Sequence, residues 1–216
     1  ALWDTMGLET DSFVDRNFNR PAGRWVSKIL IHTRVSPNQI SLLATSVGVF
    51  AAWCFTHGLP HWMILGAILL QLSAVIDCVD GDIARMLHKE SAAGKWLDLG
   101  GDQLVHLCLF AGIGVGLHQM NDASGPTLWL GLTAALGVVL SFITILREEQ
   151  ATTPHPRLRQ LMAKAANRDY SVILLVLTMM NRVEWFLWIA VMAIHSFWML
   201  GAWLRHQDDS NAKADS

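Results

Sequence analysis

The sequence between Arg34 and Asp77 reads VSPNQISLLATSVGVFAAWCFTHGLPHWMILGAILLQLSAVI, and none of its 42 residues is Asp, Glu, Lys or Arg. One polar turn, HGLPH at residues 57–61, interrupts it. A helix that crosses the hydrocarbon core of a bilayer needs about 20 apolar residues, so this segment is long enough for two crossings. It therefore predicts a hairpin of two membrane-spanning helices.

The rest of the chain contains four more segments without these charged residues. Residues 103–121, 123–146 and 185–204 are each long enough for one crossing. The segment of residues 170–181 is shorter than a usual crossing, but the long polar side chains that flank it can reach toward the membrane interfaces. We therefore expect an all-α integral membrane protein with six transmembrane helices. If residues 170–181 lay flat instead, there would be five, and the C-terminus would lie on the opposite side.

The composition agrees with a membrane protein. The 216 residues are 52% hydrophobic and 16% charged, whereas soluble domains carry about 25% charged residues. This composition excludes a disordered chain, a collagen and a coiled coil, and we expect no nucleic-acid partner. The three cysteines, Cys54, Cys78 and Cys108, contain no CxxC pair, which predicts buried free thiols.

The basic residues are divided unequally between the two sides of the predicted bundle. With six crossings, 15 of the 16 Lys and Arg residues fall on the side of the two termini, and only Arg182 falls on the other. Because cytoplasmic loops carry the excess of Lys and Arg, we expect this side to face the cytoplasm in a prokaryotic-type inner membrane. Residues 1–34 then form a cytoplasmic juxtamembrane segment, residues 35–205 the six-span domain and residues 206–216 a disordered polar tail.

The segment before the first crossing carries two rows of residues with helical spacing. The basic row comprises Arg16, Arg20, Arg24 and Lys28, and the apolar row comprises Val14, Phe18, Val26 and Leu30. Pro21 suits the first position of a second helix. We therefore expect a pair of amphipathic helices on the anionic inner face of the membrane; a solvated helical linker is the alternative.

Four acidic residues lie beside the apolar segments. Asp77 and Asp80 are three residues apart, and Asp98 and Asp102 are four apart, so each pair shares one face of a helix. A short polar loop at residues 87–93 joins the two helices as an antiparallel pair, which lets the four carboxylates converge.

Carboxylates within a membrane are energetically unfavourable unless a partner neutralises them. Carboxylate oxygens are preferred ligands of hard divalent cations such as Mg²⁺. Four acids suit two ions, an arrangement used for displacement at phosphorus. Gly81 and Ala84 leave room beside the acids, and Arg85 could hold a phosphate. A purely structural role for five acids within 26 residues, including Asp82, is the less favoured interpretation.

The spacing Asp77-x2-Asp80-Gly81-x2-Ala84-Arg85-x8-Gly94-x3-Asp98-x3-Asp102 resembles the signature of the CDP-alcohol phosphotransferase (CDP-alcohol phosphatidyltransferase) family at all eight positions. The resemblance extends to the six-span arrangement. It implies that a CDP-alcohol donates its substituted phosphate to the hydroxyl of an acceptor alcohol and releases CMP. It also implies two divalent cations, Mg²⁺ or Mn²⁺, and a homodimer.

The same resemblance implies roles for individual residues. The implied metal ligands are Asp77, Asp80, Asp98 and Asp102, and Asp102 is also the implied general base. The implied nucleotide pocket comprises Pro37, Asn38, Gly81, Ala84, Arg85, Ser91 and Gly94. Asp82 and Cys78 occupy variable positions of the signature and receive no role.

Residues outside the signature allow less specific expectations. Arg147 and Arg168 are candidates for binding the acceptor phosphate, although positive-inside bias alone explains most basic residues in this region. His106, one turn after Asp102, is expected to be a packed or hydrogen-bonded core histidine. The Trp residues are expected to be interface anchors.

A finer resemblance concerns the branch of the family. Residues 10–16 (TDSFVDR), 19–21 (NRP), 167–169 (NRD) and 184–188 (EWFLW) resemble the membrane domain of di-myo-inositol phosphate phosphate synthase-type proteins. In that branch the domain is often fused behind a cytidylyltransferase domain, which the non-Met first residue would suit. The donor alcohol and the acceptor stay open: the donor is CDP-diacylglycerol or a CDP-polyol such as CDP-inositol, and the product is a phospholipid or an inositol phosphodiester.

Two functions of other classes would also use these residues. A cation- or proton-coupled transporter would place acids in the membrane, but transporters commonly contain two repeated halves, and no second half of this chain repeats the acidic cluster. A membrane adaptor without activity is the other alternative, and the intact signature disfavours it.

Overall fold

The computed structural model describes residues 14–33, 35–87, 91–121, 125–151, 154–165 and 169–214, of which 164, 165 and 208–214 are described as backbone only. Every element in this part of the chain is a helix, which confirms the all-α prediction. In chain order they are η2 (Asp15–Asn19), α1 (Arg20–Leu30), α2 (Pro37–Thr56), α3 (Pro60–Met86), α4 (Ala92–Met120), α5 (Thr127–Glu149), α6 (Pro156–Ala165), α7 (Asp169–Met179) and α8 (Val183–Ala214).

Local sequence signals set the helix boundaries. Ser36 caps α2 in a reciprocal capping box with Gln39, and Pro37 occupies the first turn of the helix. Ser91 caps α4 through a hydrogen bond from the backbone N–H of Gly94. Gly58 adopts a positive φ of 68° in the turn between α2 and α3, a conformation that favours glycine.

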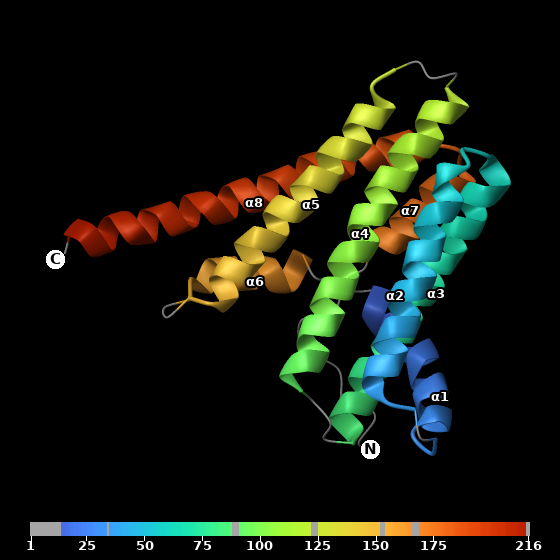
Figure 1. Ribbon diagram of the computed structural model, residues 1–216, viewed down its shortest axis with the longest axis horizontal. Helices are drawn as coiled ribbons and strands as arrows, with labels where there is room; N and C mark the ends of the chain where they lie inside the picture. Colours follow the sequence, from blue (N-terminus) through green and yellow to red (C-terminus); the bar gives the residue numbers. More distant parts are fainter. Residues whose placement is uncertain are drawn as a thin grey trace.

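The helices form a bundle centred on α2, α3 and α4 (Figure 1). Helix α5 packs on α4, and α8 packs on α5 and runs obliquely across the bundle. Helix α1 lies beside α3 near the end of the bundle where α3 ends and α4 begins, and α6 contacts α5 and α8. This end, called the site end below, also holds the last turn of α5.

In the part of the chain that the structure describes, five helices are long and apolar enough to cross a membrane: Pro37–Thr56, Pro60–Met86, Ala92–Met120, Thr127–Glu149 and Val183–Gln207. The remaining expected crossing, residues 170–181, corresponds to the shorter apolar helix α7, with 11 residues. Such a helix is about 16 Å long, roughly half of the hydrocarbon core. The structure therefore supplies five full-length spans and one helix of about half that length.

The position of α7 explains its length. At its start, Ser171 donates a hydrogen bond of 2.7 Å to Gln71 in the middle of α3, and the ring of Tyr170 packs at a tilt against that of His106 in the middle of α4, with 5.0 Å between the ring centroids. Just beyond its end, Asn181 lines a pocket with Asn121, which follows the end of α4. Because α7 begins halfway along the bundle, about half the usual number of apolar residues carries the chain to the end opposite the site end.

The N-terminal segment differs from the expected helix pair. Residues 14–30 form one continuous helical segment, in which a π-helical turn at Asp15–Asn19 leads directly into α1. Pro21 is accommodated in the first turn of α1 without a break. Arg20, Gly23 and Ser27 are buried, whereas Phe18, Trp25 and Ile29 are exposed. Whether a second helix precedes this segment concerns residues 1–13, which lie outside the described part of the chain.

The other end of the chain also differs from expectation. Helix α8 continues to Ala214, through residues assigned to a polar tail. Residues 206–214 (HQDDSNAKA) contain no Gly or Pro, so no strong local signal ends the helix where the apolar segment ends.

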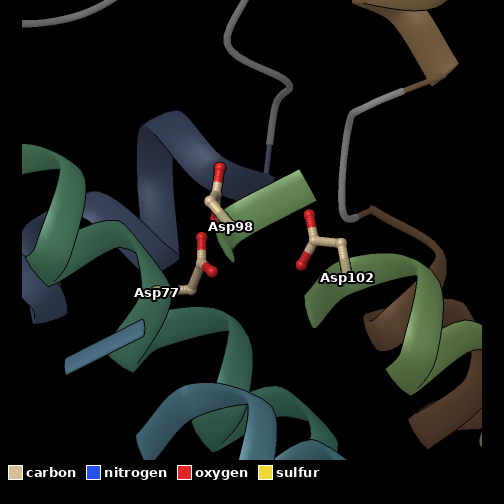
Figure 2. Close-up of side chains that lie close together, drawn as sticks. All are labelled: Asp77, Asp98 and Asp102. Atoms are coloured by element: carbon tan, nitrogen blue, oxygen red, sulfur yellow. The ribbon is translucent and has the colours of Figure 1, made fainter. Parts of the chain in front are cut away.

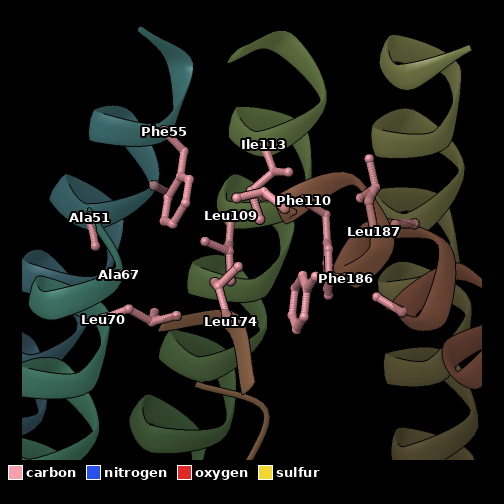
Figure 3. Close-up of a cluster of buried hydrophobic side chains, with 14 of the residues drawn as sticks. Ala51, Phe55, Ala67, Leu70, Leu109, Phe110, Ile113, Leu174, Phe186 and Leu187 are labelled. Carbon is pink, nitrogen blue, oxygen red and sulfur yellow. The ribbon is translucent and has the colours of Figure 1, made fainter. Parts of the chain in front are cut away.

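Among the described residues, the core is built where α2, α3, α4, α5, α7 and α8 meet. Figure 3 shows Phe55 of α2, Leu70 of α3, Leu109 of α4, Leu174 of α7 and Phe186 of α8 in one buried cluster. The cysteines are free thiols as predicted, and Cys54 is the fully buried member of the three.

Close packing of α2 against α4 depends on a glycine. A Cβ atom placed on Gly116 would lie 1.9 Å from the carbonyl oxygen of Phe55, so Gly116→Ala forces the two backbones apart. We expect a loss of about 1–3 kcal/mol or more of stability, measured as a lower Tm of the detergent-solubilised protein. Gly100 lies in the same helix with nothing within 4 Å of such an atom, so Gly100→Ala should not lower Tm. Equal shifts for both variants would contradict this reading of the α2–α4 contact.

Candidate functional site

Three acidic residues of α3 and α4 meet near the site end. Figure 2 shows Asp77 of α3 facing Asp98 and Asp102 of α4. One carboxylate oxygen from each lies within 4.8 Å of the others, and all three residues are half-buried. The antiparallel arrangement of the two helices and the four-residue spacing in α4 produce this convergence.

These three carboxylates fit a divalent cation. Two oxygens bound to one ion at 2.0–2.6 Å can lie at most about 4–5 Å apart, and the observed spread of 4.8 Å allows this after small side-chain movements. Three carboxylates so close together repel one another unless positive charge lies between them. Their oxygen chemistry suits Mg²⁺ or Mn²⁺.

The fourth expected ligand, Asp80, takes a different position. It is buried, and its Oδ2 accepts a hydrogen bond from the hydroxyl of Ser41 on α2. Among the residues that the structure describes, Asp80 does not belong to the cluster of Asp77, Asp98 and Asp102. In this arrangement Asp80 links α3 to α2 on the border of the cluster.

The expected nucleotide pocket is partly assembled from α2 and α4. Asn38, in the first turn of α2, and Ser91, the N-cap of α4, both approach Gly94: their side-chain oxygens lie 3.1 Å from where a Cβ atom of Gly94 would be. Pro37 starts the helix that carries Asn38. Gly94 therefore leaves open space that any other residue would fill, between two groups able to form hydrogen bonds.

The second part of the expected pocket lies on α3. The guanidinium of Arg85 lies over Gly81, whose hypothetical Cβ atom would be 3.3 Å from Arg85 Nη2. Arg85 Nη2 donates a hydrogen bond of 2.9 Å to Asp82 Oδ1. Ala84, in the next turn of α3, is half-buried.

A small cavity adjoins the carboxylate cluster. Its lining includes Asp77 and Asp102 together with the polar side chains of Ser73, His106 and Tyr170. His106 Nδ1 donates to the backbone carbonyl of Asp102 at 2.7 Å, and its ring packs against Tyr170. This agrees with the prediction of a hydrogen-bonded core histidine.

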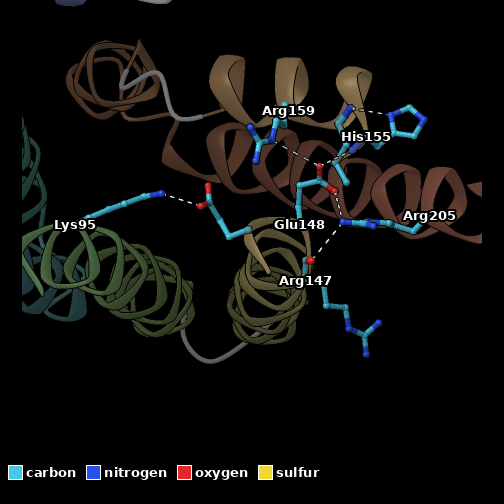
Figure 4. A network of polar contacts seen from close by, with 8 residues as sticks. Lys95, Arg147, Glu148, His155, Arg159 and Arg205 are labelled. Atoms are coloured by element: carbon cyan, nitrogen blue, oxygen red, sulfur yellow. Dashed lines mark hydrogen bonds and ion pairs between the residues drawn. The ribbon is translucent and has the colours of Figure 1, made fainter. Parts of the chain in front are cut away.

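The candidate acceptor-binding residues are not brought to the cluster by any described contact. Arg147 lies exposed near the end of α5, where its carbonyl accepts a hydrogen bond from Arg205 and its side chain points away from Glu148 (Figure 4). Arg168 lies outside the described residues. Both assignments stay predictions.

Three residues around the site were given no part in it from the sequence. The sequence pattern does not distinguish Ser41, places Asp82 at a variable position of the signature and puts Arg20 in a basic row on a membrane surface. The structure puts Ser41 against Asp80, and Arg20 and Arg85 against Asp82. An acid two residues after Asp80 and a serine one turn after Pro37 are the available signals in the sequence. The contacts of Ser41 with Asp80 and of Arg20 with Asp82 join different helices, so local spacing does not indicate them.

Five long apolar helices and a half-buried carboxylate cluster define an integral membrane protein with a candidate site for divalent cations. The family model for CDP-alcohol phosphatidyltransferase matches residues 34–202, a range that includes all eight signature positions. The chain belongs to this family, which confirms the resemblance seen in its sequence.

Curated relatives include proteins of several names. A bifunctional IPC transferase and DIPP synthase of Aquifex aeolicus is 28% identical over 168 residues, which cover 76% of this chain and 37% of that protein. A phosphatidylinositol phosphate synthase of Corynebacterium glutamicum is 33% identical over 98 residues, covering 45% of this chain and 44% of that protein. The chain therefore spans less than half the length of each of these two relatives.

Solved structures share the fold. The apo structure of Mycobacterium tuberculosis phosphatidylinositol phosphate synthase (PgsA1) matches with a TM-score of 0.59 and 18% identity, covering 82% of this chain and 94% of that chain. The structure of the same protein in complex with manganese and citrate matches with a TM-score of 0.58, covering 84% and 88%.

Proposed function

We propose that this protein transfers a substituted phosphate group from a CDP-alcohol to the hydroxyl of an acceptor alcohol and releases CMP. The observation that carries the proposal is the convergence of Asp77, Asp98 and Asp102 within a chain of the CDP-alcohol phosphatidyltransferase family. In this reaction the acceptor oxygen forms a bond to the β-phosphorus, the bond from that phosphorus to the bridging oxygen breaks, and CMP leaves with that oxygen.

In the proposed site, Asp77, Asp98 and Asp102 hold divalent cations, and Asp80 contributes from the border of the cluster. The expected number is two ions, Mg²⁺ or Mn²⁺. Bound cations supply charge neutralisation on the pyrophosphate and on the leaving CMP. Asp102 is proposed to accept the proton of the attacking hydroxyl, because it lines the small cavity beside the cluster, toward which the acceptor hydroxyl would point.

The nucleotide is proposed to lie between the two glycine positions. At Gly94 a ligand meets Asn38 and Ser91, and at Gly81 it meets the guanidinium of Arg85. Pro37 orients the helix turn that presents Asn38, and the small side chain of Ala84 leaves space for the ligand. An acceptor phosphate would bind among the basic residues of the site end, for which Arg147 and Arg168 are candidates.

The names of the relatives favour an inositol phosphate as one substrate. Relatives include phosphatidylinositol phosphate synthases and an archaetidylinositol phosphate synthase, and the two lipid parts in these names differ. We therefore propose that the inositol part is the shared feature, with CDP-diacylglycerol or CDP-inositol as the donor.

The proposed membrane orientation follows from the basic residues. Lys95, Arg159 and Arg205 contact acidic partners at the site end, whereas Arg182 lies at the opposite end, next to Asn181. By the positive-inside rule the site end faces the cytoplasm. The exposed Phe18, Trp25 and Ile29 are placed to enter the interface of that leaflet. A homodimer is proposed on the family resemblance alone.

A test of this function needs the purified protein in detergent with CDP-diacylglycerol or CDP-inositol as donor and inositol 1-phosphate or glycerol 3-phosphate as acceptor. We expect CMP release that requires Mg²⁺ or Mn²⁺, stops with EDTA and returns when either metal is added in excess. Mass analysis of the product distinguishes a lipid from a soluble phosphodiester. Absence of CMP release with every pair, or metal-independent release, would contradict the proposal. Proteoliposome uptake of a cation without CMP release would favour a transporter.

A further inference from the structure

Asp82 is a buried acid on α3 that the proposed reaction does not use. It lies about 140° around the helix from Asp77, at 3.6 residues per turn, and therefore does not face the carboxylate cluster. Its side chain is only 1% exposed. A buried carboxylate without partners would be strongly unfavourable, so its partners should explain why it is there.

Two guanidinium groups share one oxygen of Asp82. Arg85 Nη2 lies 2.9 Å from Oδ1, and Arg20 Nη1 lies 3.4 Å from the same atom. Arg85 comes from the last turn of the same helix, whereas Arg20 comes from α1. The side chain of Arg20 is 9% exposed and that of Arg85 is 28% exposed, so only Arg85 keeps a substantial surface toward a ligand.

The α1 helix is fixed firmly enough to hold Arg20 in place. Gly23 lets α1 approach α3 closely, because a Cβ atom there would lie 3.3 Å from Cys78 Cβ and 3.4 Å from the carbonyl of Val75. Ser27, one turn later, is fully buried. The position of Arg20 is therefore set by backbone packing and not by a flexible tail.

The contact with Asp82 determines where the Arg85 guanidinium lies. Arg85 ends a long helix and would otherwise sample many rotamers. Held by Asp82, it folds back over Gly81, one turn after Asp77, with Nη2 and Nη1 at 3.3 and 3.5 Å from the hypothetical Cβ position. An arginine has five N–H donors, so a guanidinium that uses one Nη on Asp82 can still bind an anionic ligand.

We infer that Asp82 is a positioning residue for the nucleotide site, and that Arg20 makes the juxtamembrane helix α1 part of that site. Asp82 orients Arg85 toward the bound nucleotide, and Arg20, from α1, stabilises the carboxylate of Asp82 at the same oxygen. The inference rests on the proposed function, since it takes Arg85 to contact the nucleotide. Through Arg20, any displacement of α1 from α3 would weaken nucleotide binding.

The test is a CDP titration in the presence of Mg²⁺, with the full-length chain in detergent and binding followed by calorimetry. We expect Asp82→Asn to weaken CDP binding about tenfold, because an arginine that is no longer pre-oriented must be immobilised on binding. Arg20→Gln should weaken it about threefold, since the Asp82–Arg85 pair remains. Glu184→Gln, which removes an acid at the opposite end of the bundle, should leave the affinity unchanged.

A double-mutant cycle separates positioning from a general structural effect. If Asp82 acts through Arg85, then Asp82→Asn adds no loss of CDP affinity in an Arg85→Gln background. The inference would be overturned if the double variant lost CDP affinity by the product of the two single-variant factors. It would also be overturned if Asp82→Asn bound CDP like the wild type. If Asp82→Asn does not fold, Arg20→Gln decides, and unchanged CDP affinity there overturns it. Failure of the wild-type protein to bind CDP would instead contradict the proposed function.

Discussion

Asp102→Asn is expected to reduce CMP release by about 10²–10⁴-fold, the range attributed to a positioned proton acceptor. Asn has nearly the same size and shape as Asp and can still offer an oxygen to a cation, but it does not accept a proton from a hydroxyl. Asp102 lines the cavity beside the cluster, where the acceptor hydroxyl is proposed to enter. Steady-state CMP release with saturating donor, acceptor and Mg²⁺ measures the effect.

Asp98→Asn is the matched control, because Asp98 belongs to the same cluster on the same helix face. It replaces a charged metal ligand with a weaker, neutral one and leaves the base in place, so raised Mn²⁺ should restore part of its activity. Raised Mn²⁺ should not restore Asp102→Asn. Substantial activity in Asp102→Asn, or equal rescue of both variants by Mn²⁺, would contradict the assignment of Asp102 as the base.

The carboxylate cluster could be predicted from the sequence because its geometry is largely local. The four-residue spacing of Asp98 and Asp102 fixes one helix face. The segment between the end of α3 at Met86 and the start of α4 at Ala92 is so short that the two helices pack antiparallel. The all-α membrane architecture follows from the same kind of information, since the length of an uncharged segment decides whether it can cross.

Contacts between distant parts of the chain were not predictable in this way. Nothing in the spacing of the basic row indicates that Arg20 turns toward Asp82, 62 residues later, because the row is equally compatible with a membrane surface. Similarly, the hydrogen bond from Ser171 to Gln71 places the start of α7 halfway along the bundle. An uncharged segment of 12 residues gives the length of a helix but not the depth at which it begins.

A third buried acid outside the carboxylate cluster, after Asp80 and Asp82, joins three helices at the site end. Glu148 of α5 is fully buried, and Figure 4 shows its carboxylate among Arg159, His155 and Arg205. Arg205 Nη2 of α8 lies 2.6 Å from Oε2, and the backbone N–H of His155, which precedes α6, donates to Oε1 at 2.7 Å. Arg159 of α6 lies 4.0 Å away.

Glu148→Ala is expected to destabilise the protein by about 3–5 kcal/mol, since removal of one partner of a buried ion pair leaves the other charge uncompensated. Here the loss also leaves a backbone N–H without its acceptor. The measurement is Tm in detergent, together with the rate of proteolysis in residues 150–168, because α6 loses its link to α5. Glu148→Gln should lie between the wild type and Glu148→Ala, since its amide oxygen can still accept from His155.

The neighbouring residue provides a control that differs mainly in burial. Glu149 pairs with Lys95 at 2.7 Å, but the side chains are 33% and 64% exposed. Exposed ion pairs contribute about 0–1 kcal/mol, so Glu149→Ala should lower Tm little. If the two variants lower Tm equally, the difference in burial does not determine how much each ion pair stabilises the protein. If Glu148→Ala lowers Tm but does not speed cleavage within residues 150–168, Glu148 stabilises the α5–α8 contact and not α6.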